Sequence, residues 1–261
     1  VVFVDPDDWI LPDYCLGLYN LQAAYSGRGL VIQGMLCRRT DGTSLPSLSL
    51  PDRYLPFSSI GKSFAENNIC EMGYAVSKIY ARSIIEEFSI RFDENIHCLE
   101  DLLFMYQYLL HCDYLVLNHM QNYVYVKHSF SLSHRIHSFE SEYCCFVKYQ
   151  QLLAEMMKVW KIPAGDMVVT VNSMLVPFRR ALKSDYQPDR TIPREMRVKH
   201  LKRMISESRD VFLKYYHPVF KTDKLGKVLL GFNCYILYDF YIRLLFRLNI
   251  GPVFYGPKHM Y

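Results

Sequence analysis

Apolar and polar positions follow different patterns in the two halves of the chain, and the first half predicts strands and helices in turn. Apolar runs, and one alternation of tyrosine with valine, predict strands over residues 1–4, 30–38, 114–117 and 121–126. Helical patterns predict helices over residues 12–24 and 102–110. Residues 40–57, rich in proline and serine, predict a long loop of the kind that often covers a site or binds an acceptor.

From residue 138 onward the pattern is helical. It predicts helices over residues 138–161 and 166–182, the second bent at Pro177. We therefore expect a boundary near residue 135. The two predicted domains are an α/β domain over residues 1–135 and a helical extension over residues 136–261.

An acidic cluster follows the first predicted strand. Asp5, Asp7 and Asp8 come directly after residues 1–4, which are apolar on both faces, as in a central parallel strand. Ligands of open α/β sheets bind beyond the carboxyl ends of such strands. In an extended chain Asp5 and Asp7 point the same way, and their hard oxygens favour Mg²⁺ or Mn²⁺, while Asp8 turns aside or binds through water. An acidic turn that caps the next helix is the alternative interpretation.

A second acidic pair opens the helix predicted over residues 102–110. In the first turn of a helix, the dipole and the unbonded N–H groups favour the ionised form of Asp101, the form in which a general base must start. Ordinary capping of a helix by acidic residues also explains Glu100 and Asp101. The two clusters together favour a site that binds a metal and moves a proton.

Ordered motifs give the chain a resemblance to a known family. They are V-F-V-D-P-D-D-W-I at residues 2–10, L-V-I-Q-G at 30–34, S-K-I-Y at 77–80, I-R-F-D-E-N-I at 90–96, L-E-D-L-L-F at 99–104, and Y-V-Y at 123–125 with Ser131. In this order they resemble the inverting family 2 glycosyltransferases of the GT-A fold, especially bacterial enzymes that build surface polysaccharides of the cell envelope. The resemblance implies an α/β fold class: the acceptor-side half of a Rossmann-like mixed sheet with helices, followed by a mainly α-helical C-terminal extension.

The same resemblance implies an activity. A sugar would pass from a nucleotide-diphosphate sugar to a saccharide or lipid-linked acceptor with inversion. Asp101 would take the acceptor proton, and Glu100 would orient the loop or an acceptor hydroxyl. A Mn²⁺ or Mg²⁺ cofactor, held by the DxD motif of Asp5, Asp7 and Asp8, would neutralise charge on the departing diphosphate.

Other candidate residues keep two interpretations each. Lys78 contacts phosphate or acceptor, or it is an exposed lysine on a helix. Trp9 stacks on a sugar face, or it belongs to the core. Among His128, His134 and His137, which follow the last predicted strand, His128 is the candidate metal ligand; a solvated or hydrogen-bonded loop histidine is the alternative.

The nucleotide-binding half of this family carries a P-x-Y-N turn and a D-D-G-S loop, and neither motif occurs in the sequence, which starts at Val1. We therefore interpret the chain as the acceptor-side half of a catalytic domain, without its N-terminal half, followed by an extension. An apolar strand left at the edge of its sheet then predicts self-association.

Composition narrows the class of protein. A hydrophobic content of 51% and an aromatic content of 15% are too high for a disordered chain. A net charge of +4 gives no argument for a nucleic-acid partner. The eight cysteines contain no CxxC pair, which favours reduced thiols in a cytoplasmic protein over a disulfide framework or a zinc site.

Residues 225–250 raise the question of a membrane surface as a partner. They are densely apolar and aromatic, but Lys227, Asp239, Arg243 and Arg247 interrupt them, so they make a poor membrane-spanning helix. An interfacial helix, peripheral at the inner face of a membrane, and a helix packed on the catalytic domain both fit. A basic helix is predicted earlier in the sequence, and a solvated face is the favoured interpretation, with contact to a membrane or nucleic acid as the alternative. Its basic residues are Arg194, Arg197, Lys199, Lys202 and Arg203.

Three function classes stay open, and the first two use the same carboxylates. The first is a metal-dependent glycosyltransferase, and the second is another carboxylate and metal enzyme, such as a phosphotransferase or nuclease. The third is a non-catalytic binding or membrane-associated scaffold.

Overall fold

The computed structural model describes residues 1–66, 69, 72–128, 136–162, 168–187, 189–218, 221–248 and 250. The chain forms two compact units, each described here by itself. The first unit spans residues 1–94, 99–131 and 152–166, and the second spans residues 95–98, 132–151 and 167–261. The first is mixed α/β and the later part of the chain is helical, which confirms the predicted fold class.

The first unit contains two four-stranded mixed sheets. Its strands are β1 (Trp9–Ile10), β2 (Gly29–Gln33), β3 (Met35–Arg39), β4 (Ser44–Leu48), β5 (Arg53–Pro56), β6 (Lys78–Tyr80), β7 (Tyr114–Asn118) and β8 (Tyr123–Lys127). Its helices are α1 (Tyr14–Ala23), α2 (Phe57–Glu66), α3 (Arg82–Glu87) and α4 (Glu100–Leu109). The sheet orders are β1-β8-β3-β4 and β5-β7-β2-β6, each with a central parallel pair flanked by antiparallel strands.

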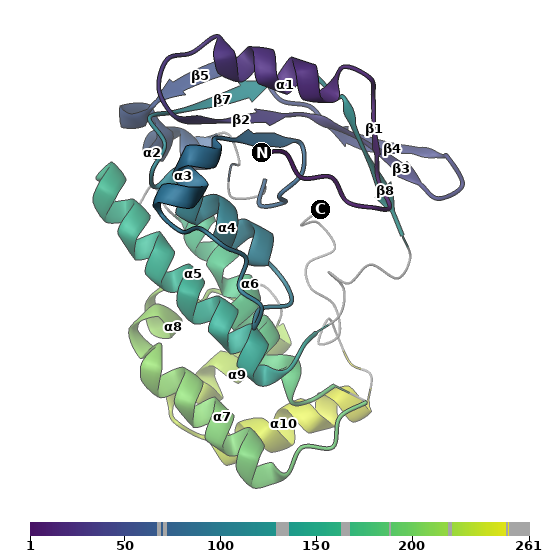
Figure 1. Ribbon diagram of the computed structural model, residues 1–261. Coiled ribbons are helices and arrows are strands. Elements are labelled where there is room, and N and C mark those ends of the chain that lie inside the picture. Colours follow the sequence, from purple (N-terminus) through teal and green to yellow (C-terminus); the bar gives the residue numbers. More distant parts are fainter. Residues whose placement is uncertain are drawn as a thin grey trace. The chain divides into compact units, whose positions relative to one another are not determined.

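Several predicted elements are confirmed in this unit. Helices α1 and α4 and strands β7 and β8 correspond to the helices and strands predicted for those parts of the sequence. Helix α1 lies across one face of the strands (Figure 1), where it buries Tyr14 and Leu18 against Val31 of β2 and Val116 of β7. Strands β2 and β7 are buried at every position, as expected for a parallel pair covered on both faces.

The single strand predicted over residues 30–38 is wrong, because the chain passes from one sheet to the other at Gly34. The Gly34 N–H donates to the carbonyl oxygen of Asn118, and a β-carbon at Gly34 would lie 2.5 Å from the carbonyl oxygen of Leu48. Only a residue without a side chain fits that approach. The apolar pattern continues through the glycine, so periodicity alone could not detect the change of sheet.

The long loop predicted over residues 40–57 is also wrong. It contains β4 and β5 and the first residue of α2. Both strands lie at the edge of their sheets, and Pro46 and Pro56 are tolerated there because an edge strand leaves half of its backbone groups outside the ladder.

Residues 1–4 form no strand, in contrast to the prediction. Val1 exchanges backbone hydrogen bonds of 2.7 and 2.8 Å with Tyr80, but the ladder extends no further. Val1 and Val4 are 46% and 44% exposed, so the segment is not buried on both faces. Its anchor is Phe3, whose ring packs edge-on against Tyr80 and Phe104, with both centroid distances 5.6 Å.

The second unit is helical. Its helices are the first part of α5 (Phe139–Trp160), α6 (Val168–Ser184), α7 (Arg194–Glu207), α8 (Arg209–Tyr215), α9 (Lys221–Gly231) and α10 (Tyr235–Arg247). Helices α5 and α6 confirm the two long helices predicted after residue 138, and Pro177 lies inside α6. The predicted start of the second helix, at residue 166, lies outside the described residues.

The apolar stretch at residues 225–250 is two helices. Helix α9 ends at Gly231, and Asn233 takes a φ of 58°, a left-handed conformation that stops a helix, before α10 begins. In the part of the chain that the structure describes, no helix combines the length and the apolar character needed to cross a membrane.

Candidate functional site

The acidic cluster near the N-terminus is a turn fixed on β8. The Asp8 N–H donates to the carbonyl oxygen of Asp5 at 3.1 Å, and proline follows Asp5, as in a β-turn. Asp8 Oδ2 accepts a 2.6 Å hydrogen bond from the Tyr123 hydroxyl, and Oδ1 accepts a 2.7 Å bond from the Val126 N–H. The expectation that Asp5 and Asp7 face one way along extended backbone is therefore wrong.

Tyr123 is a site residue whose role the sequence did not reveal. Its hydroxyl donates to Asp8 and accepts a 3.2 Å hydrogen bond from the Asp5 N–H, so one side chain holds both ends of the turn. The alternation of tyrosine and valine along β8 predicts on which face of the strand the side chain of Tyr123 lies. It does not give the partner, which lies more than a hundred residues away.

The two acidic clusters lie close together. Phe3, two residues before Asp5, contacts Phe104, which is three residues after Asp101 on α4. Desolvation is the main reason that the pKa of Asp5 is raised, and repulsion from neighbouring aspartates and from Glu100 adds to it. The turn and the first turn of α4 are therefore near enough to interact electrostatically.

Asp101 has the electrostatics of a base that works near neutral pH. Burial raises the pKa of Asp101 from 3.8 to about 7, and repulsion from Glu100 adds to the increase. Its Oδ1 accepts a 2.7 Å hydrogen bond from the Leu102 N–H, which partly offsets the effect of burial. Leu99, immediately before the pair, has a φ of 66°, a conformation that branched side chains rarely adopt and that recurs at functional sites.

Lys78 is fully buried on β6, so the alternative of an exposed lysine on a helix is wrong. Its ammonium group donates to the carbonyl oxygens of Tyr74 and Val76. Burial holds the pKa of Lys78 well below its usual range, and the nearby charge of Asp101 acts in the opposite direction. A contact of Lys78 with phosphate or acceptor stays a prediction.

His128 lies beside the acidic turn. Its Nε2 is 3.3 Å from Asp7 Oδ2 and is buried without a hydrogen bond. Burial raises the pKa of both Asp5 and Asp8, and repulsion from Asp7 adds to it, so a cation would find negative charge here. Within the described residues, no three His, Cys, Asp or Glu side chains surround one point. Binding of Mn²⁺ or Mg²⁺ by these residues therefore stays a prediction.

The remaining candidates lie in different surroundings. Trp9 is 57% exposed on β1, so the core interpretation is wrong and stacking on a sugar stays a prediction. His137 belongs to the second unit, where its N–H donates to Glu142 at 2.7 Å, and His134 lies outside the described residues.

Comparison with known proteins identifies solved structures that share the fold of this chain. No protein-family model and no curated protein sequence matches the chain. Crystal structures of TarS from S. aureus, a glycosyltransferase, match it in three dimensions. TarS 1–349 in complex with UDP-GlcNAc matches with a TM-score of 0.59 and 16% identity over 95% of this chain and 68% of that one. The complex with UDP gives 0.57 and 16% over 96% and 67%. The chain therefore shares the fold of this glycosyltransferase.

Proposed function

We propose that the chain transfers a sugar from a nucleotide-diphosphate sugar to an acceptor hydroxyl, with inversion at the anomeric carbon. The observation that carries the proposal is the packing of Phe3 against Phe104, which places the acidic turn at Asp5 beside the carboxylates that open α4. A transfer of this kind needs negative groups for a diphosphate-bound cation next to a base for the acceptor. The fold shared with TarS, whose complexes contain UDP-GlcNAc and UDP, supports a nucleotide-sugar donor.

In this proposal Asp101 accepts the proton of the acceptor hydroxyl as its oxygen attacks the anomeric carbon. Its raised pKa of about 7 makes it a stronger base than an ordinary aspartate, while much of it stays ionised at neutral pH. Glu100, at the start of the same helix, orients an acceptor hydroxyl. Lys78 is buried on β6, and its charged form opposes the effect of burial on the pKa of Asp101.

Asp7 and His128 are the residues best arranged to hold Mn²⁺ or Mg²⁺, with Asp5 beside them. Both carboxylate oxygens of Asp8 accept hydrogen bonds from β8, which keeps the turn in place. When bound, the cation supplies Lewis-acid stabilisation of the charge that develops on the diphosphate. Trp9 is exposed on β1, which pairs with β8, so its ring is accessible for stacking on a sugar ring.

Thermal unfolding tests donor and cation together. The protein is measured as its gene encodes it. A nucleotide sugar such as UDP-GlcNAc is expected to raise its unfolding temperature only when Mn²⁺ is present. Asp7→Asn should raise the Mn²⁺ concentration that gives half of this response about tenfold or more, because a charged ligand is lost. Asp13→Asn, an exposed aspartate without a side-chain capping bond, is the matched control and should respond as the unaltered chain does.

No rise in unfolding temperature with either Mn²⁺ or a nucleotide sugar would contradict the proposal and favour a non-catalytic scaffold. Stabilisation by Mn²⁺ with simple phosphate esters, and no preference for nucleotide sugars, would favour a phosphotransferase.

A membrane surface is a further partner in this proposal, as expected of an enzyme with a lipid-linked acceptor. Exposed apolar side chains on and between α9 and α10 include Leu225, Val228, Phe232, Ile236, Phe240 and Leu244. Arg243 and Arg247 are exposed beside them, whereas the acids of the two helices, Asp223 and Asp239, are buried. Apolar side chains interspersed with exposed cations alone suit anionic headgroups.

Vesicle sedimentation tests this partner. Binding to phosphatidylglycerol vesicles is expected to exceed binding to phosphatidylcholine vesicles, and Phe240→Ser with Leu244→Ser should weaken it at least about tenfold. Leu16→Ser with Tyr19→Ser, which removes similarly exposed side chains from α1, should leave it unchanged. Equal binding by all three proteins, or no preference for the anionic lipid, would remove the membrane from the proposal.

A further inference from the structure

Two exposed cations lie opposite each other where β3 and β8 end. The two strands run parallel, and Arg39, the last residue of β3, is in register with Lys127, the last residue of β8. Among the described residues, neither side chain forms an ion pair. Hydrogen bonds from Thr43 lower the pKa of Asp41, in the turn after β3, and Arg39 adds to this from beyond ion-pair distance. Like charges on neighbouring strands repel, so an anion between the two cations would be stabilising.

The pair faces the same side of the sheet as the acidic turn. Side chains alternate along a strand, so Lys127 points to the face of β8 that carries Tyr123, and Arg39 points to the face of β3 that carries Cys37. The Tyr123 hydroxyl bonds to the turn at Asp8, and Cys37 packs against the core cluster that contains Tyr123. Burial is the main reason that the pKa of the Cys37 thiol is raised, and the charges of Lys127 and Asp8 act on it in opposite directions. The cations and the turn therefore share one face.

Strand β8 also brings the pair next to the turn along the chain. Asp8 accepts a hydrogen bond from the N–H of Val126, the residue before Lys127. In His128, the residue after it, Nε2 lies 3.3 Å from Asp7 Oδ2 and is buried without a hydrogen bond. The sheet order β1-β8-β3-β4 then places the acids on the β1 side of β8 and the basic pair on β8 and β3. A cation held by the turn and an anion held by the pair would lie side by side, beyond the carboxyl ends of parallel strands.

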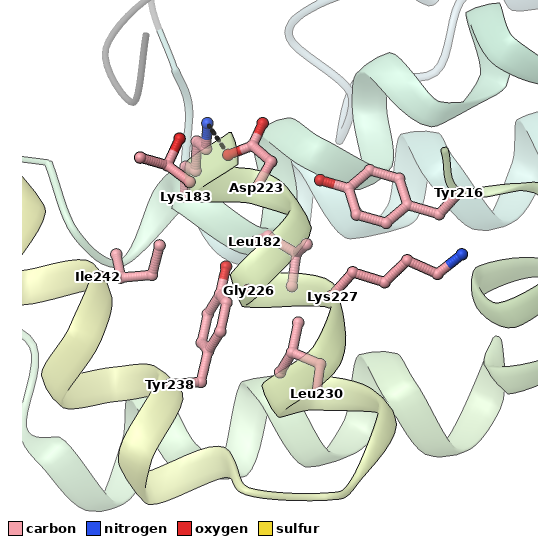
Figure 2. Close-up of a pocket in the computed structure, with 10 residues that line it drawn as sticks. Leu182, Lys183, Tyr216, Asp223, Gly226, Lys227, Leu230, Tyr238 and Ile242 are labelled. Atoms are coloured by element: carbon pink, nitrogen blue, oxygen red, sulfur yellow. Dashed lines mark ion pairs between the residues drawn. The ribbon is translucent and has the colours of Figure 1, made fainter. Parts of the chain in front are cut away.

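The ends of β3 and β8 also offer the space that an oxyanion needs, because Arg39 and Lys127 are both exposed. The pocket in the second unit that Figure 2 shows does not. There Lys183 Nζ lies 3.5 Å from Asp223 Oδ1, and the space beside them holds about one water molecule. Of these two places, only the strand ends can receive a group as large as phosphate.

We infer that Arg39 and Lys127 bind a phosphate group of a substrate, beside the cation proposed at Asp7. The inference rests on the proposed function and adds two binding residues to it. A guanidinium group holds two phosphate oxygens at once and an ammonium group adds a point charge, so the pair suits a multiply charged phosphate. The diphosphate of the donor and a phosphate carried by the acceptor share this chemistry.

Thermal unfolding at constant ionic strength tests the pair, with the protein as its gene encodes it. Inorganic pyrophosphate, added as its Mn²⁺ complex, is expected to raise the unfolding temperature to a plateau. Arg39→Gln with Lys127→Gln should raise the half-saturating concentration about tenfold or more. Without ligand this double variant should unfold at the same temperature or higher, because the two like charges are gone. Lys62→Gln, which removes an exposed lysine of α2, should leave the half-saturating concentration unchanged.

Two further probes separate the sources of the phosphate. An equal loss for UDP with Mn²⁺ in the double variant assigns the pair to the donor. Unchanged UDP binding, with loss of the stabilisation that methyl phosphate gives to the UDP complex, assigns it to the acceptor. A response to pyrophosphate that depends on the pair, without any response to UDP, keeps the inference and contradicts the proposed function instead. The inference is overturned if the double variant responds to all three probes as the unaltered chain does, or if none of them stabilises the unaltered chain.

Discussion

Asp101→Asn is expected to reduce sugar transfer by about a hundredfold to ten-thousandfold while leaving donor binding intact. That range is the usual contribution of a positioned general base. The amide keeps the shape of the side chain and can still accept the Leu102 N–H bond, but it cannot accept the acceptor proton. Steady-state transfer rates, with thermal shifts by a nucleotide sugar as the measure of donor binding, separate the two effects.

Asp13→Asn provides the control for the chemical change, because Asp13 is exposed and makes no side-chain capping bond. Transfer by Asp101→Asn within threefold of the unaltered chain would end the assignment of Asp101 as the base. A proportional loss of donor binding would instead point to a structural role.

The pH dependence of the unaltered chain follows from the raised pKa of Asp101. The base works only when deprotonated, so kcat/KM should rise with pH through an inflection near 7 instead of near the ordinary value of 3.8. For stability the sign is opposite. A carboxyl whose pKa is higher in the folded chain contributes stability that is complete below about pH 4 and lost as pH rises through about 7, at most about 4 kcal/mol. Asp101→Asn should lack that loss and be at least as stable as the unaltered chain above pH 7.

The parts of this site that could be predicted from sequence are those set by local rules. Glu100 and Asp101 open α4 as expected, since acids at the start of a long apolar helix obey capping preferences. Strands β7 and β8 followed from apolar runs and alternation. What failed depended on neighbours distant in sequence. Residues 1–4 are apolar enough for a strand, but a strand also needs a partner for its whole length, and only Val1 is paired.

Burial of charged residues was the least predictable feature. One of the two interpretations of Lys78 places it at the surface, because lysine is rarely buried, yet it is enclosed completely and bonded to backbone carbonyl oxygens. Nothing in the local pattern S-K-I-Y distinguishes it from an exposed lysine of a strand. The prediction that the basic helix is a solvated face is wrong for Arg197 of α7, which is 8% exposed. Its partner is Asp239 of α10, one of the charges that interrupt the apolar stretch at residues 225–250.

Breaking the buried pair of Arg197 and Asp239 is expected to lower the free energy of unfolding strongly. Asp239 Oδ1 accepts a 2.6 Å hydrogen bond from Arg197 Nε and a 3.1 Å bond from the Tyr186 hydroxyl, and Oδ2 accepts a 3.0 Å bond from Arg197 Nη2. Asp239 is 2% exposed. Removing one partner leaves the other as an uncompensated buried charge, so Asp239→Leu or Arg197→Met alone should each lower the free energy of unfolding by about 3–5 kcal/mol.

The double variant distinguishes a buried charge from a simple loss of contacts. With both groups replaced by apolar side chains no charge remains, so Asp239→Leu with Arg197→Met should cost far less than the two single changes added together. The exposed pair Arg82 and Glu86 of α3, with side chains 77% and 55% exposed, is the matched comparison, and its loss should cost no more than about 0.5 kcal/mol. Urea unfolding measures these free-energy differences, and a separate hydrogen-exchange experiment on the amides of α7 and α10 shows whether these helices open. Single variants that cost less than about 1 kcal/mol would mean that water reaches the pair and that α10 is held chiefly by its apolar contacts.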